Sequence, residues 1–60
     1  MLNYLFYDNE TGENFYVQEK SEQSAWSLLM REYEGDLDEV EFTGEVHSDY
    51  VAEQIGFDTY

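Results

Sequence analysis

The chain has 60 residues with fifteen Asp or Glu against two Lys or Arg, which gives a formal net charge of −13. We expect one small acidic domain over residues 1–60, of marginal stability because so short a chain buries only about 60% of its unfolded-state surface. The absence of Cys and the presence of one His exclude disulfides, thiolate metal sites and histidine clusters.

Two segments at the start of the chain predict a β-hairpin. Leu2 to Tyr7, LNYLFY, is rich in aromatic and bulky residues, and residues 14–19, NFYVQE, provide the return strand. The turn between them covers residues 8–13, where Gly12 is expected at positive φ. The first strand is apolar on both faces, so we expect it at the centre of a sheet.

The same apolar start ends at Asp8, and no basic residue precedes it. It is too short to span a membrane, and it lacks the arrangement of a signal peptide. We therefore expect a cytoplasmic protein without a membrane partner.

A helix is predicted from Ser21, as its N-cap, to Glu34. Gly35 is expected as the C′ residue that ends this helix. Apolar residues recur at helical spacing and are expected to face the core. They are Ala25, Trp26, Leu28, Leu29, Met30 and Tyr33.

A third strand is predicted over about Glu39 to Val46, with Gly44 marking a bulge. Ser48 then caps a short helix, residues 49–55, which ends at Gly56. The apolar residues of this helix that we expect to face inward are Val51, Ala52 and Ile55.

The order β-β-α-β-α predicts an α+β fold. Chain direction places the third strand antiparallel to the first, which gives a three-stranded antiparallel sheet in the order 2-1-3. The main helix packs on one face of this sheet. The short C-terminal helix or a second subunit covers the other face.

The acids are concentrated in the second half of the chain. Residues 1–31 hold five acids and two bases, net −3, whereas residues 32–60 hold ten acids and no base, net −10. On the third strand, acids alternate with apolar residues, and side chains two residues apart lie about 6.6 Å apart. Such a row imitates the phosphates that DNA-binding proteins contact with Lys and Arg. The predicted partner-binding residues are Asp36, Asp38, Glu39, Glu41, Glu45, Asp49 and Glu53, with Tyr50 as an aromatic anchor. The alternative is a solvated face that protects an edge strand from aggregation.

Tyrosines supply a second candidate feature, because Tyr4, Tyr7, Tyr16 and Tyr60 cannot all be buried in so small a domain. Tyr is enriched at interfaces, where it brings a large area and a polar tip. The alternatives are contact with a partner, stacking on the far face of the sheet, and a homodimer.

Metal binding and catalysis find little support in the sequence. DLDEVE, residues 36–41, lacks the Gly and Glu spacing of an EF-hand loop. His47, Ser48 and Asp49 are neighbours in sequence, which does not make a catalytic triad. We therefore expect no metal, no other cofactor and no enzymatic activity.

The segment SDYVAEQIGFDTY, residues 48–60, and the helix core Ala25, Trp26 and Leu29 carry a resemblance. The chain resembles small acidic proteins encoded by phages and prophages of Gram-positive bacteria, which pair a hairpin, an A-W-x-x-L-like helix and a short tail. The resemblance covers most of the chain in length, charge and layout. It implies a host-directed accessory role, because several such proteins resemble DNA and block host nucleases, glycosylases or polymerases.

Together these features predict a protein that works by binding. As a DNA-mimic inhibitor, it would block a basic nucleic-acid-binding site on a host or defence protein in the host cytoplasm, without contacting nucleic acid itself. The alternative is a phage structural or assembly protein, a homo-oligomer whose charge only provides solubility.

Overall fold

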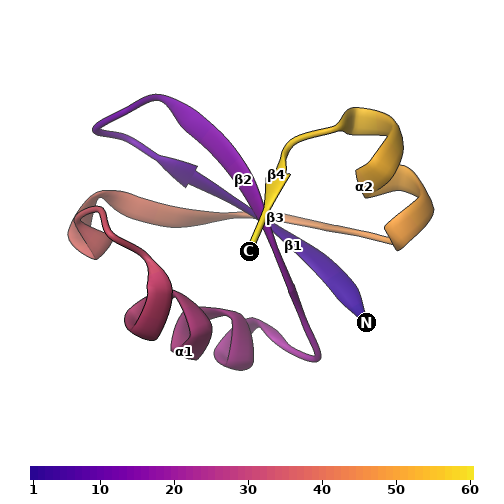
Figure 1. The fold of residues 1–60 in the computed structure, drawn as a ribbon, viewed down its shortest axis with the longest axis horizontal. Coiled ribbons are helices and arrows are strands. Elements are labelled where there is room, and N and C mark those ends of the chain that lie inside the picture. Colours follow the sequence, from indigo (N-terminus) through magenta and orange to yellow (C-terminus); the bar gives the residue numbers. More distant parts are fainter.

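The computed structural model describes residues 1–60 as a four-stranded sheet with an α-helix on each face (Figure 1). The strands lie in the order β3-β1-β2-β4. In chain order the elements are β1 (Leu2–Asp8), β2 (Glu13–Glu19), α1 (Glu22–Glu32), the 3₁₀ helix η1 (Leu37–Glu39), β3 (Val40–His47), α2 (Asp49–Ile55) and β4 (Asp58–Thr59).

The three long strands take the expected order, with β1 between β2 and β3 and both pairings antiparallel. The prediction of a three-stranded antiparallel sheet is wrong, because β4 pairs in parallel with β2. Tyr16 lies opposite Thr59, and the N–H of Tyr60 donates to the carbonyl of Tyr16 at 2.8 Å. A strand of two residues carries no periodic signal, so the sequence pattern could not reveal it.

The main core lies between the sheet and α1, and Phe6 is at its centre. Its ring is fully buried and packs edge-on against Trp26 at 4.9 Å between centroids. It also contacts Phe42 at 5.5 Å and Phe15 at 6.0 Å. Buried residues of this core are Tyr4, Phe6, Phe15, Val17, Ala25, Leu29 and Val40.

Helix α1 begins as predicted, since the Ser21 side chain accepts a hydrogen bond from the N–H of Ser24. It ends at Glu32, before the predicted end, because Tyr33 turns to an extended conformation (φ −77°, ψ 129°). The Tyr33 hydroxyl then donates to Asp8 on β1. This contact between distant segments overrides the helical pattern.

Two expectations for the end of α1 are wrong. Gly35 does not take the left-handed conformation of a C′ residue. It leaves room for the Tyr33 ring instead, since a Cβ at Gly35 would lie 2.6 Å from Tyr33 Cε2. Met30 was expected to face the core, yet it is 72% exposed.

Strand β3 begins at Val40, because Glu39 belongs to η1. A bulge interrupts its pairing with β1, as predicted from Gly44, whose φ is +90°. Val46 lies opposite Tyr4 and Phe42 opposite Phe6, so four residues of β3 advance over two of β1.

Helix α2 covers part of the other sheet face, where Ala52 packs with Leu5 and Tyr16. Its predicted caps are present, with Ser48 at the start and Gly56 at φ +80° at the end. The expected inward packing holds only for Ala52, because Val51 and Ile55 are 38% and 45% exposed. Neither α1 nor α2 is long and apolar enough to cross a membrane.

A polar group is left unpaired beneath α2. Tyr16 is fully buried, and its hydroxyl has no hydrogen-bond partner in the protein. Burying an unpaired hydroxyl costs about 1–3 kcal/mol, so Tyr16→Phe is expected to raise the free energy of unfolding by about 1 kcal/mol in urea denaturation. Tyr33→Phe is the matched control and should lower it, because Tyr33 donates to Asp8. A destabilised Tyr16→Phe would contradict the absence of a partner.

Candidate functional site

The carboxylates of this chain are almost entirely without cationic partners. The one contact within 4 Å between a basic and an acidic group joins His47 Nε2 to Glu45 Oε1 at 3.4 Å. Lys20 and Arg31 form no ion pair. Ion pairs with Lys or Arg therefore do not hold the fold together, and the repulsion among the carboxylates remains uncompensated.

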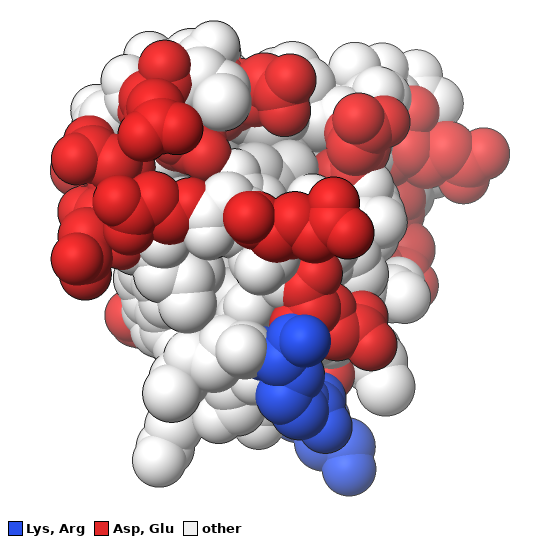
Figure 2. Space-filling model, turned by 60° about the vertical axis from the view of Figure 1, so that its left-hand side comes forward, with Lys and Arg blue, Asp and Glu red and all other residues white.

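Acidic side chains gather where the β1–β2 turn, the end of α1 and η1 meet. Asn9 fixes η1 beside the turn, because its backbone N–H and side-chain amide donate to the carbonyl of Glu39 at 2.8 and 3.1 Å. Figure 2 brings this end forward and shows carboxylates spread over it, with the two basic side chains together below. We call the exposed carboxylates here the acidic end; they are Glu10, Glu13, Glu32, Glu34, Asp36, Asp38 and Glu39.

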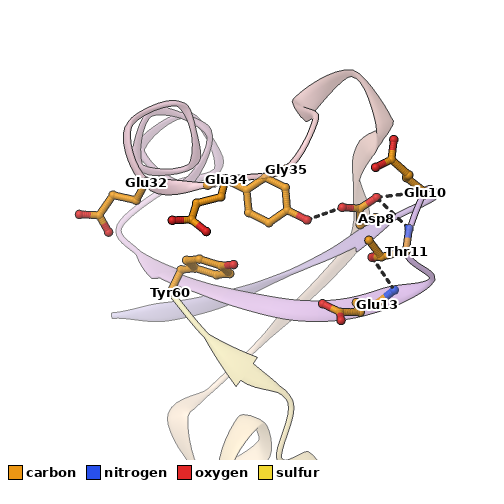
Figure 3. A pocket seen from close by; sticks show the side chains of 9 residues that line it. Asp8, Glu10, Thr11, Glu13, Glu32, Glu34, Gly35 and Tyr60 are labelled. Carbon is orange, nitrogen blue, oxygen red and sulfur yellow. Dashed lines mark hydrogen bonds between the residues drawn. The ribbon is translucent and has the colours of Figure 1, made fainter.

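A hollow of about 540 Å³ opens within the acidic end (Figure 3). Four acidic-end residues from both the turn and the end of α1 line it, together with the ring of Tyr60. Tyr60 packs edge-on against Tyr33 at 5.7 Å. Burial, and then the charges of Glu13 and Glu34, raise the pKa of the Tyr60 hydroxyl. The hollow is thus a region of negative potential with an aromatic wall.

Asp8 fastens the two sides of the hollow together. It is 1% exposed, and its Oδ1 accepts the N–H groups of Glu10 and Thr11 at 2.8 and 3.3 Å. Its Oδ2 accepts the Tyr33 hydroxyl, which is the largest cause of the lowered pKa of Asp8. Burial and this bond raise the pKa of the Tyr33 hydroxyl, which keeps it a donor. Asp8 is therefore a structural carboxylate that holds the acidic end in place.

Asp8 makes stability depend on pH in a defined direction. Because its folded-state pKa lies below the ordinary value of 3.8, its stabilisation is fully present above that value. It is lost as pH falls through the lower folded-state pKa. Asp8→Asn is therefore expected to be less stable than the wild type near neutral pH, with the difference closing below about pH 4. Urea denaturation across pH measures this; a difference that does not change with pH would contradict it.

The predicted binding residues divide between two regions. Three of them, Asp36, Asp38 and Glu39, belong to the acidic end, and Glu39 lies in η1 outside the expected strand. Register places Val40 opposite Asp8 and His47 opposite Asn3. These two ends of β1 are five residues or about 17 Å apart. Asp36, Asp38 and Glu39 therefore lie beyond one end of β3, and the residues of α2 lie beyond its other end. Those away from the acidic end are Glu41 and Glu45 on β3 and Asp49, Tyr50 and Glu53 on α2.

Asp49 has a structural role at the start of α2. Its Oδ1 accepts the side-chain amides of Asn3 at 2.7 Å and Gln18 at 2.9 Å. Both hydrogen bonds lower the pKa of Asp49, and the bond from Asn3 has the larger effect. Tyr50 beside it is 72% exposed, as an anchor would require. Their part in binding a partner stays a prediction.

Sequence reasoning missed the acids contributed by the first half of the chain. Glu10 and Glu13 lie in the turn cluster, and Glu32 and Glu34 follow the apolar stripe of α1. The sequence shows several acids in the turn, but the position of this turn beside η1 depends on strand register. Of the tyrosines considered, Tyr4 and Tyr16 are buried, Tyr7 is half-buried and Tyr60 lies at the hollow.

Nowhere do three or more acidic or His side chains come together in an arrangement that could hold a metal ion. Comparisons with protein-family models, curated protein sequences and solved structures found no match. The resemblance to phage proteins stays a prediction.

Proposed function

We propose that this protein works by binding, without chemistry of its own, and that its acidic end occupies a basic nucleic-acid-binding site on another protein. One observation carries the proposal. Seven exposed carboxylates from three segments gather at one end of the molecule, and neither Lys20 nor Arg31 pairs with any of them. Such a surface presents to Lys and Arg side chains the charge that DNA phosphates present.

Rigid support favours this use of the acidic end. Asp8 ties the β1–β2 turn to the end of α1, and Asn9 ties the turn to η1. Because the carboxylates sit on elements that are already joined, less backbone ordering is needed when a partner binds. A net charge of −13 also attracts a basic partner over a distance, which speeds association and makes it sensitive to salt.

The resemblance to phage accessory proteins suggests the kind of target. In this proposal the partner is a host or defence protein that contacts nucleic acid through a basic groove. The bound protein then excludes DNA from that groove, which makes it an inhibitor.

Competition with DNA tests the proposal. The protein is immobilised on a resin and incubated with bacterial lysate at about 50 mM salt, and the retained proteins are eluted with duplex DNA. We expect the immobilised protein to retain basic nucleic-acid-binding proteins at low salt. Duplex DNA should displace them, and about 200 mM salt should release them. Retention of no basic protein at low salt, or retention that DNA does not disturb, would overturn the proposal.

An assembly role is the second candidate, and exposed apolar residues of α2 favour it. Val51 and Ile55 are partly exposed, and Phe57 beyond the helix is 40% exposed. A homo-oligomer could bury these residues. Sedimentation distinguishes the two roles: a stable oligomer whose behaviour is unchanged by neutralising the acidic end supports assembly.

A further inference from the structure

Strand β3 is an uncovered edge of the sheet. Its eight residues pair only with β1, whereas β4 closes part of the opposite edge at β2. Thr43 and Gly44 in the middle of β3 are both exposed. An edge of this length offers a row of backbone donors and acceptors to another extended segment.

The two faces of β3 differ in chemistry. Val40 and Phe42 belong to the α1 side and pack on its core, and Val46 on that side is 42% exposed. Glu41 lies opposite Tyr7 on the other face, and Glu45 reaches His47 there. A strand added beside β3 would therefore meet apolar side chains on one face and carboxylates on the other.

Charge decides which occupant this edge accepts. A second copy would place its own Glu41 and Glu45 beside the same residues, and each copy carries −13. Like charges directly opposite one another on a sheet are destabilising. The bulge at Gly44 also divides the strand into two short paired stretches, residues 40–42 and 46–47, which opposes one long regular pairing between two copies. The carboxylates that oppose self-pairing favour a short basic strand, which does not need a long regular pairing.

We propose that the open edge of β3 binds an extended segment of the basic partner as an additional antiparallel strand, with Lys or Arg facing Glu41 and Glu45 and apolar residues facing Val46. This docking mode rests on the proposed function for its partner. It adds a second contact region beyond the acidic end and gives β3 a role in recognition.

A synthetic peptide of about ten residues that alternates Lys with Val tests this inference. NMR of the full chain should show amide protons of β3 shifting and gaining protection from exchange when the peptide binds. A peptide of equal charge, N-methylated at alternate positions, cannot donate to the edge and should bind about tenfold more weakly. Glu41→Gln/Glu45→Gln should weaken binding of the unmethylated peptide, whereas Glu19→Gln/Glu22→Gln on β2 and α1 should not.

The outcomes separate this inference from the proposed function. Equal binding of both peptides, or peptide binding that leaves the β3 amides unchanged, would overturn strand addition while leaving a role for the acidic end. If DNA-displaceable basic proteins are not retained in the lysate experiment, the proposed function fails. Protection of β3 by the peptide would still show that the edge accepts a basic strand.

Discussion

Phe6→Ala is expected to leave the protein largely unfolded at room temperature. The Phe6 ring is fully buried and contacts three other aromatic rings, so its removal opens a cavity at the centre of the core. Truncating a buried Phe costs about 3–5 kcal/mol. A chain of this length has a total stability of about 3–9 kcal/mol. Circular dichroism and thermal melting measure the loss.

Met30→Ala is the control, because Met30 is apolar but 72% exposed. Its melting temperature should stay close to that of the wild type. A folded, cooperative Phe6→Ala protein would contradict the placement of Phe6 at the centre of the core.

Neutralising carboxylates of the acidic end is expected to lower the affinity for the partner and to raise the stability of the fold. Glu10→Gln/Glu13→Gln/Glu34→Gln removes three charges around the hollow. If each contact with a partner contributes about 1 kcal/mol, affinity for the captured partner should fall roughly a hundredfold. The melting temperature should rise, because repulsion among the carboxylates decreases. Titration calorimetry and thermal melting provide the two readouts.

A matched triple variant changes the same charge elsewhere. Glu19→Gln/Glu22→Gln/Asp58→Asn alters β2, α1 and β4 outside the acidic end. It should retain most of the affinity for the captured partner. Equal loss of affinity in both variants would mean that only net charge matters to the partner.

Local signals in the sequence were sufficient for most elements of this fold. Gly12 and Gly56 take positive φ where turn and cap chemistry predict it, and Ser21 and Ser48 cap the two helices. The predictions were wrong where contacts with distant segments override the local sequence pattern. Tyr33 leaves α1 early to reach Asp8, which lies 25 residues before it in the chain.

The candidate site was predicted less well for the same reason. Ten of the fifteen acids lie in residues 32–60, and this density along the chain favours β3 as the binding surface. The bond from Asn9 to Glu39 brings the acids of the first turn beside η1, across 30 residues of sequence. No periodicity within one segment contains that information, because it arises from strand pairing.

Carboxyl footprinting of the wild-type protein, free and bound to a partner that DNA displaces, tests the central claim most directly. Exposed carboxylates are labelled with carbodiimide and an amine, and mass spectrometry locates the label. Burial under a basic groove should shield Glu10, Glu13 and Glu34 in the complex while Glu19 and Glu22 stay reactive. Unchanged labelling of the acidic end, with protection elsewhere, would show that these carboxylates do not form the binding surface.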